Sequence, residues 1–549
     1  MLVVAACGDD AVDPADAEAR DLYGVWLSEA TPERPEVYAI SFHERGVYHP
    51  ALATARDVYT KYELTSLGQK VTELGTYRVE GGVLYRTGVW IDGATLATPT
   101  EYERSLLAIT RGGLLSIEGP PGASLPADYQ ATDRCEVPLR RGWRTYAVQR
   151  ATYTMRDQPG GNPIDARFTA DGRLVGALQG AVFAYGDDCI PEVGDDYVGR
   201  TSLVPTSDGM HVLIGGGVGD ARASMYSKLG ASGLPLPEPQ ALGAMARDVV
   251  DAADLGGTLA VLTGTPTAPS IVRADGVVLT PTNLPPAFVA RTLVGVGANA
   301  MIIGTGSSTG FGARLYLVEQ SGAGWTNTLV PFEVNAAYIA AATVGDDLYI
   351  VHMTGSDPGA KRPRVLFLTR RIAGTWIAPV AIGLGADPRI TVVDGIVYVA
   401  SSYVTSSIET SAQVWRVDGD VSTGWSVAEG FVHDPNAYIA PAIPAARADG
   451  TFAVGYISQL FVRKPDDRIT DTVPFEVRIT GNGRVTSSDG VVNCTQTCTV
   501  QVELDRVLLL RAESATAAPS EVVGAIDPGN PAYAYRVMAT NVSPLQVNF

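Results

Sequence analysis

The sequence predicts an all-β protein with several domains, and three observations support this prediction. The chain of 549 residues contains 59 Gly and 35 Pro, which supply many turns. Hydrophobic residues make up 46% of the chain and charged residues only 18%, too few charges for long helices that face solvent. A turn followed by a short apolar run also recurs through the middle of the chain. At about 100–200 residues per domain, the length corresponds to about three or four domains.

The charge balance excludes nucleic acid as a partner. The formal net charge is −18, from 59 acidic and 41 basic residues. Nucleic-acid binding requires clustered Lys and Arg that displace counterions from phosphates. The basic runs here, such as Arg140-Arg141, are short and isolated. A net charge of this kind keeps an exported protein soluble.

The N-terminus predicts export and a lipid anchor at Cys7. Val4-Ala5-Ala6-Cys7 resembles the lipobox of bacterial lipoproteins, in which the cysteine is acylated and then becomes the new N-terminus. The resemblance implies a signal and tether over residues 1–20 and a protein held by lipid at the outer membrane, in the periplasm or on the cell surface. Because a signal peptide has a basic region and about 7–15 apolar residues, we expect the natural start to lie further upstream. A cytoplasmic protein with a chance apolar start is the alternative.

The cysteines agree with export. Apart from Cys7 there are four, Cys135, Cys189, Cys494 and Cys498, a number that suits two disulfides in an oxidising compartment. We expect Cys494 to bridge Cys498 locally, which leaves Cys135 to pair with Cys189. Free thiols are one alternative. A metal site is another, but it requires further ligands, and the nearest preceding histidine is His433.

Seven copies of a turn and an apolar run occupy the middle of the chain. Turns such as Asp208-Gly209 and Asp394-Gly395 precede the runs, and successive turns lie roughly 37–55 residues apart, close to the ~40–50 of a propeller blade. The runs are Arg173–Gly176, Met210–Ile214, Leu259–Leu262, Ala300–Ile303, Leu348–Val351, Ile396–Val399 and Thr451–Gly455.

Two further markers repeat within these units. Several runs are followed by a second strand-like segment: Ser270–Arg273, Arg314–Val318, Arg364–Leu368 and Gln413–Val417. A tryptophan then follows at a turn in three successive units, as Trp325, Trp376 and Trp425, where its ring can pack between neighbouring units. The markers predict a seven-bladed β-propeller over residues 156–468. A helix over the Ala-rich stretch Pro239–Asp254 is the alternative there.

The two flanking sections carry weaker resemblances. In residues 21–155, the runs Leu22–Trp26, Tyr38–Phe42 and Gly75–Val79 resemble strands of small lipocalin-like barrels, which are either hollow or filled by their own side chains; we expect a filled barrel. In residues 469–549, the run Val477–Ser487 followed by Cys494 and Cys498 resembles small Cys-containing repeat modules of bacterial surface proteins. This resemblance implies a spacer or contact surface, although the family's tryptophan is missing.

Candidate catalytic motifs have simpler explanations. Gly306–Gly310 matches G-x-S-x-G, but a nucleophile elbow requires a helix after the serine, and Phe311–Val318 is strand-like. The Gly-rich segment 215–219 likewise opens no helix that could bind phosphate. The five histidines, His43, His49, His211, His352 and His433, are scattered. We therefore assign no catalytic or cofactor-binding residue.

One weak metal site remains. Asp418, Asp420 and Ser422 alternate oxygen ligands as a calcium loop does, but the glycine and the distal Glu of an EF-hand are missing. The acidic pairs Asp187-Asp188 and Asp195-Asp196 could likewise gather a cation near Cys189. A solvated turn is the alternative in each case, and calcium is the only cofactor we consider.

The sequence favours a non-enzymatic scaffold whose propeller binds a protein or glycan partner, held to a membrane by its lipid. The alternative is a hydrolase or lyase acting on carbohydrate or peptide. Such chemistry requires two carboxylates within about 10 Å or a metal. Converging Asp, Glu, His or Arg side chains in a central pocket would favour catalysis, whereas a channel lined by Ser, Thr and Gly would favour binding. The sequence does not indicate an oligomeric state.

Overall fold

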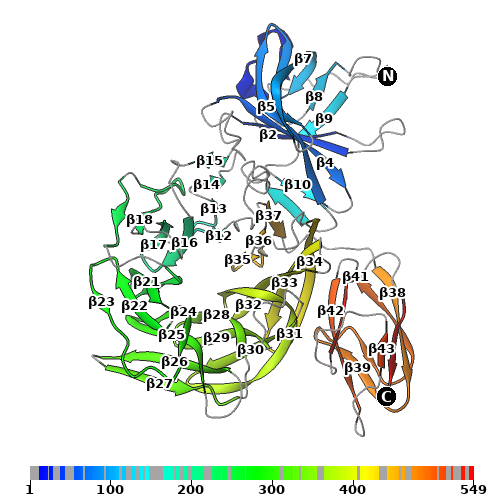
Figure 1. The fold of residues 1–549 in the computed structure, drawn as a ribbon. Coiled ribbons are helices and arrows are strands. Elements are labelled where there is room, and N and C mark those ends of the chain that lie inside the picture. The colour runs from blue at the N-terminus through cyan, green and yellow to red at the C-terminus, as the bar shows by residue number, and fades with distance from the viewer. Residues whose placement is uncertain are drawn as a thin grey trace. The chain divides into compact units, whose positions relative to one another are not determined.

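The computed structural model confirms the all-β class (Figure 1). In the part of the chain it describes, the helices are two short 3-10 turns, Pro14–Asp16 and Ala19–Leu22. None of these described helices is long and apolar enough to span a membrane. The described residues are 11–22, 24–28, 37–43, 55–65, 68–91, 94–110, 114–118, 127–131, 136–139, 143–146, 165–178, 181–185, 191–193, 201–215, 224–236, 238–243, 249–265, 267–307, 313–322, 324–332, 336–354, 364–404, 409–431, 442–456, 459–463, 472–503, 506–514, 521–523, 533–537 and 543–549.

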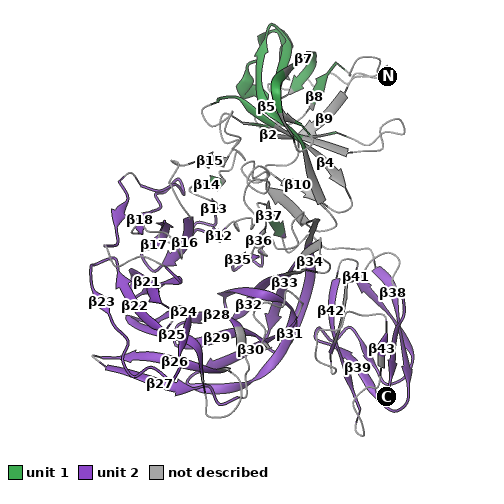
Figure 2. Ribbon diagram, viewed as in Figure 1, with its two compact units in different colours: residues 1–158, 183–193, 458–462 green, residues 159–182, 194–457, 463–549 purple. Residues whose placement is uncertain are grey.

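The chain divides into two compact units (Figure 2). The first comprises residues 1–158, 183–193 and 458–462, and the second comprises residues 159–182, 194–457 and 463–549.

In the first unit, eight antiparallel strands close into a barrel. Each strand pairs with the next, and the last, β9, pairs with both β8 and β2. Apolar side chains, among them Trp26, Phe42 and Tyr77, are buried together in one core, so this barrel is filled. The strands are β2 (Gly24–Ser28), β3 (Val37–His43), β4 (Val58–Thr65), β5 (Gly68–Glu80), β6 (Val83–Ile91), β7 (Ala94–Thr110), β8 (Leu114–Ile117) and β9 (Ala127–Ala131).

In the second unit, seven inner strands follow one another around a closed ring. Each inner strand lies against the next, and the last lies against the first. Arg167 Nη1 closes the ring by donating to the carbonyl oxygen of Pro444 at 3.0 Å, across 277 positions of sequence. The inner strands are β12 (Asp165–Phe168), β16 (Thr201–Thr206), β20 (Asp251–Leu255), β24 (Val289–Val296), β28 (Ala336–Val344), β31 (Thr375–Val393) and β35 (Ile443–Ala446).

An antiparallel sheet extends outward from these inner strands, which is the repeated blade of a β-propeller. The sheets are β16-β17-β18-β19, β20-β21-β22-β23 and β24-β25-β26-β27. Strand β31 is shared, because it ends the sheet β28-β29-β30-β31 and begins β31-β32-β33-β34. The outer strands include β17 (Gly209–Ile214), β21 (Thr258–Thr265), β25 (Asn299–Ser307), β29 (Asp347–Thr354), β32 (Ile396–Val404), β33 (Glu409–Asp418) and β34 (Val421–Phe431).

The predicted turns lie where the inner strand meets the second strand. The Asp208-Gly209 turn joins β16 to β17, and Asp394-Gly395 joins β31 to β32. Gly209 and Gly395 have φ values of 139° and 77°, a backbone conformation that glycine adopts without strain. The helix alternative is wrong for both described ends of its stretch, because Gln240–Ala241 is strand β19 and Asp251–Leu255 is strand β20.

The tryptophan markers pack between neighbouring blades, as predicted. Trp325 contacts a core shared by the blades of β20 and β24, and Trp376 contacts one shared by the blades of β24 and β28. The third marker, Trp425, also packs on Phe452 of the blade that begins with β35, with ring centroids 5.7 Å apart, but it lies inside strand β34 and not at a turn. A Cβ at Gly424 would come within 2.3 Å of the Trp415 ring, so this glycine makes room for a buried tryptophan.

The C-terminal section is a sandwich of two sheets. One sheet has the order β41-β38-β45-β43, and the other contains β40, β39, β42 and β44. Phe475, Val477 and Leu510 are buried between them, and Phe549 packs over Gly483. The strands are β38 (Thr472–Thr480), β39 (Arg484–Ser487), β40 (Asn493–Cys494), β41 (Cys498–Glu503), β42 (Arg506–Glu513), β43 (Glu521–Val523), β44 (Tyr533–Val537) and β45 (Leu545–Asn548).

Candidate functional site

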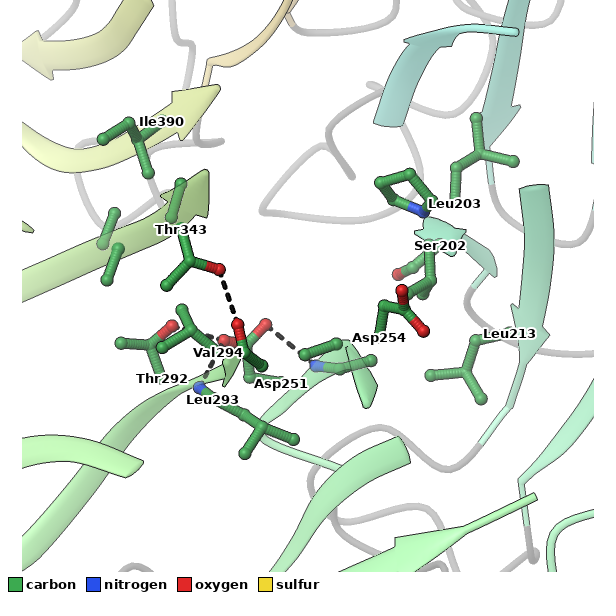
Figure 3. A pocket seen from close by; sticks show the side chains of 18 of the residues that line it. Ser202, Leu203, Leu213, Asp251, Asp254, Thr292, Leu293, Val294, Thr343 and Ile390 are labelled. Carbon is green, nitrogen blue, oxygen red and sulfur yellow. Dashed lines mark hydrogen bonds between the residues drawn. The ribbon is translucent and has the colours of Figure 1, made fainter. Parts of the chain in front are cut away.

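The inner strands surround a cavity of about 640 Å³ (Figure 3). Every one of these strands contributes lining residues. Many of the residues are small, including Ala252, Gly295 and the run Ala340 to Ala342. Because such residues fill little space, the centre of the ring stays hollow, at a size typical of small-molecule sites.

One register position of the inner strands lines the cavity all the way round. On each inner strand, a hairpin turn leads to the second strand, and the residue in question lies four positions before the last paired residue ahead of that turn. On β20 the last paired residue is Leu255, and the residue four positions before it is Asp251. We call these residues the cavity layer. They are Asp165, Ser202, Asp251, Thr292, Ala340, Arg389 and Ile443.

The two aspartates of the layer bind the backbone of the next inner strand. Asp165 Oδ2 accepts from the N–H of Leu203 at 2.8 Å, and Asp251 Oδ2 accepts from the N–H of Leu293 at 2.9 Å. An inner strand is the edge of its sheet, so the N–H groups that face the cavity require partners. These carboxylates therefore hold neighbouring strands of the ring together.

Asp251 is the most enclosed of the cavity carboxylates. Its oxygens accept hydrogen bonds from the Thr292 hydroxyl and from the N–H groups of Leu293 and Ala252. Burial raises the pKa of this carboxyl, although these donors and Arg389 oppose the shift. The group stands in the wall of the cavity with its acceptor sites occupied by the protein (Figure 3).

Asp254 and Thr343 form hydrogen bonds with the preceding blade of the ring, whereas Asp165 and Asp251 bind the following one. Asp254 accepts from the N–H of Ser207 at 2.9 Å and from that of Gly257 at 2.7 Å. Thr343 Oγ1 donates to the carbonyl oxygen of Gly295 at 2.7 Å. All three cavity aspartates thus serve as acceptors for the fold.

The three cavity arginines differ in their partners. Arg167 donates to Pro444 and lies 3.6 Å from Asp165 Oδ1, and Arg389 donates to Asp387 Oδ1 at 2.6 Å. Arg291 is exposed and makes neither a hydrogen bond nor an ion pair with any residue the structure describes. It is the one charged lining side chain, in the described part of the chain, that the fold does not use.

A β-bulge places Arg291 at the cavity. Ala290 pairs with Gly304 and Thr292 pairs with Ile303, so Arg291 is an extra residue without a cross-strand partner. Similar register shifts occur in β28, between Ala336 and Ile339, and in β31, next to Arg389. Bulges of this kind bend the strand and redirect a side chain, and they are frequent beside functional sites.

The cavity wall combines three Asp and three Arg side chains, which would favour catalysis, with Ser, Thr and Gly residues, which would favour binding. Among the described lining residues there is no His, Cys, Glu, Lys or aromatic residue. Groups of three or more His, Cys, Asp or Glu that could hold a metal are likewise missing from the described residues. The sequence assigned no site residue to this cavity, although Gly215, the first residue of the Gly-rich segment considered for phosphate binding, lies in its wall.

The residues predicted as sites lie apart from it. Asp420 forms an ion pair with Arg370, and Asp418 lies 3.4 Å from Arg416. Ser422 is buried and donates to the carbonyl oxygen of Ile382. Since these three residues have separate protein partners, the calcium site stays a prediction. The Cys494–Cys498 disulfide is present as predicted. The residues predicted as the lipid anchor, the second disulfide, the serine of the G-x-S-x-G match and the other acidic pairs lie outside the described residues: Cys7, Cys135, Cys189, Ser308, Asp187-Asp188 and Asp195-Asp196.

Two histidines of the propeller, His211 and His352, also lie apart from the cavity. His211 on β17 is buried, and its Nε2 lies 3.1 Å from Asp208 Oδ1. His352 on β29 is buried, with Nε2 at 3.1 Å from Thr369 Oγ1 and its ring stacked on Phe367. Burial lowers the pKa of His352 to about 4, so it is neutral at pH 7.

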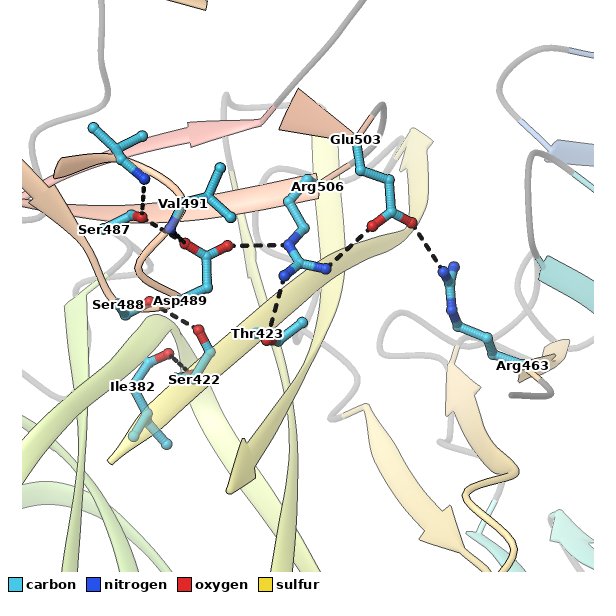
Figure 4. Close-up of polar contacts among 11 residues, drawn as sticks. Ile382, Ser422, Thr423, Arg463, Ser487, Ser488, Asp489, Val491, Glu503 and Arg506 are labelled. Carbon is cyan, nitrogen blue, oxygen red and sulfur yellow. Dashed lines mark hydrogen bonds and ion pairs between the residues drawn. The ribbon is translucent and has the colours of Figure 1, made fainter. Parts of the chain in front are cut away.

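A second polar cluster joins the propeller to the C-terminal section (Figure 4). Arg506 Nε lies 3.1 Å from Asp489 Oδ2, and its Nη1 lies 3.2 Å from Glu503 Oε2. Glu503 also binds Arg463 at 3.0 Å, and both guanidinium groups lie over the Trp425 ring, at 4.9 Å and 5.1 Å. With β34 paired to β42, this cluster fixes the C-terminal section and forms no open site.

Comparisons with solved structures find proteins that are similar over about half the chain. A streptogramin B lyase is 13% identical, with 56% of this chain and 94% of that chain covered, at a TM-score of 0.35. The propeller domain of Cps50 (Swd1) from Myceliophteria thermophila is 10% identical, with 56% and 97% covered, at 0.32. A gluconolactonase from Xanthomonas campestris is 12% identical, with 59% and 89% covered, at 0.27.

These similarities carry no argument about function, because the scores and identities are low. The fold assignment rests on the strand pairing of the chain itself. No family model matches the sequence. No curated protein matches it either.

Proposed function

We propose that this chain is an exported, lipid-anchored binding protein whose seven-bladed propeller holds a ligand in its central cavity. The observation that carries the proposal is the combination of a hollow centre with carboxylates that already serve the fold. A general acid or base must reach the reacting atom with a lone pair or proton. Asp251 and Asp254, which accept three and two hydrogen bonds from the protein, are poorly placed for this role, whereas Asp165 accepts one.

The cavity has the properties of a ligand site. Its volume of about 640 Å³ lies within the range of about 300–1,000 Å³ for small-molecule pockets. Its wall combines aliphatic residues such as Val250 and Ile390 with hydroxyl groups such as Ser202 and Thr343. The ligand is therefore a small molecule, or the part of a protein or glycan partner that enters the ring.

Filling the cavity tests this proposal. A set of small polar and aliphatic compounds is screened by ligand-observed NMR against the wild type and against Ala342→Phe, which places a ring at the cavity wall. Ala231→Phe, at an exposed turn outside the cavity, is the matched control. We expect compounds that bind the wild type and the control but not Ala342→Phe. Binding that is unchanged in a folded Ala342→Phe variant, or no binding at all, contradicts the proposal.

The anchor is supported by Val4-Ala5-Ala6-Cys7 and by the polar segment that follows. Expression of the gene with its upstream region in a bacterium, in the presence of an alkyne-labelled fatty acid, should label the wild type. Cys7→Ser should lose the label and leave the membrane fraction. Equal labelling of both forms, or none of the wild type, refutes the anchor and leaves the cavity proposal untouched.

A further inference from the structure

We propose that the cavity binds an aliphatic carboxylate and that Arg291 binds its carboxylate group. This inference rests on the proposed binding function and names the chemistry of the ligand. It starts from the one charged side chain at the cavity that has no partner among the described residues. The aspartates Asp165, Asp251 and Asp254 accept hydrogen bonds from the backbone, and Arg167 and Arg389 have acceptors of their own.

The position of Arg291 indicates a role in the cavity. It is the extra residue of the bulge in β24, so no cross-strand neighbour holds it in the sheet. Its neighbours Ala290 and Thr292 pair with consecutive residues of β25, Gly304 and Ile303, so a strand without the bulge would have no residue between them. The bulge adds a third arginine to a wall whose other charged side chains are three aspartates and two arginines. A guanidinium binds a carboxylate with two parallel hydrogen bonds, in a geometry that a lysine cannot match.

The surroundings of Arg291 select the rest of the ligand. On the neighbouring inner strands, the residues at the same level are Val250 and Ile339, each one position before its cavity-layer residue. Both are aliphatic and both line the cavity, as do Val249 and Ile390. A carboxylate at Arg291 therefore places the body of the ligand against aliphatic side chains.

The same wall disfavours a bare sugar. Tyr and Trp are common partners of flat, amphipathic ligand faces, because their aromatic rings are apolar and carry a polar O–H or N–H group. No aromatic residue occurs among the described residues that line this cavity. The observations thus favour a small branched-chain acid or an acylated amino acid, which share the aliphatic carboxylate.

Matched pairs of probes isolate the charge. N-acetyl-L-leucine and N-acetyl-L-leucinamide have nearly the same shape and differ in the carboxylate. We expect isothermal titration calorimetry to show that the wild type binds the acid about 10–100-fold more tightly than the amide, since hydrogen bonds to charged groups contribute about 1.5–3 kcal/mol. Arg291→Gln should bind both probes as weakly as the wild type binds the amide. Arg291→Lys should keep part of the preference.

Two controls separate this inference from the proposed function. Arg484→Gln, on a surface strand of the C-terminal section, should keep the full preference for the acid. Ala342→Phe should lose both probes. 4-Methylpentanoate, which lacks the amide, distinguishes the sources: binding as tight as that of N-acetyl-L-leucine indicates a free branched acid, and weaker binding indicates an acylated amino acid.

Equal binding of acid and amide to the wild type overturns the inference, and so does a preference that persists in Arg291→Gln. If neither probe binds, but other compounds bind the wild type and not Ala342→Phe, the carboxylate inference is wrong and the binding function stands. If Ala342→Phe binds every compound that the wild type binds, the proposed function itself fails.

Discussion

Acidification should destabilise the propeller through His352, because this side chain is buried as a neutral imidazole. It lies on β29 with 2% of its surface exposed, between Thr369 and Phe367. Burial lowers its pKa from 6.5 to about 4. The unfolded chain therefore binds a proton at higher pH than the native state does. The stability contributed by the neutral imidazole is fully present above pH 6.5 and is lost as the pH falls towards 4.

The size of the effect follows from the two pKa values. Between about pH 7.5 and about pH 5, the free energy of unfolding should fall by about 2 kcal/mol through this residue alone. His352→Gln keeps a polar partner for Thr369 but cannot titrate. Its stability difference from the wild type should therefore shrink by about 2 kcal/mol at the lower pH, because the effects of other titrating groups are common to both proteins.

Urea unfolding at the two pH values, followed by tryptophan fluorescence, measures this double difference. An NMR titration of the His352 ring gives the pKa directly. A stability difference that is the same at both pH values, or a ring that titrates near its ordinary pKa, would refute the reasoning from burial.

Three substitutions test other parts of the fold. Asp251→Asn places an NH2 donor where one carboxylate oxygen accepts hydrogen bonds, and it should lower the stability by about 1–3 kcal/mol, measured by urea unfolding; no change would show that these hydrogen bonds are unimportant. Asp489→Ala removes one of the two carboxylates that bind Arg506 and should cost about 1.5–3 kcal/mol, with faster proteolytic release of the C-terminal section; unchanged proteolysis would contradict this. Gly424→Ala pushes on the Trp415 ring and should cost about 1–3 kcal/mol with a shifted fluorescence spectrum, whereas an unaltered spectrum would show that the ring is not confined.

The repeat was readable from the sequence because its turns are local. A turn such as Asp394-Gly395 is determined by neighbouring residues, and the strand that follows it is apolar enough to be recognised. The tryptophan positions were readable for the same reason. The turn expected at Trp425 was wrong, because the preceding Gly424 lies within a strand and makes room for Trp415 on the neighbouring strand.

The cavity could not be predicted in the same way. Its inner strands, such as Asp251–Leu255, are short and mix small, polar and aliphatic residues, so they show no strong period. The bulge that exposes Arg291 depends on pairing with β25, which a single sequence does not show. Once the hairpin is known, counting four residues back from it finds every member of the cavity layer. This count is the signal that was missed.

The most direct test of the account observes the cavity itself. With methyl-labelled alanine, the NMR signals of Ala252, Ala340 and Ala342, which line the cavity, should shift and saturate as N-acetyl-L-leucine is added, while the signal of Ala231 stays constant. Signals that shift only outside the cavity, or none that shift for any compound bound by the protein, would contradict the claim that the ring of inner strands is the binding site.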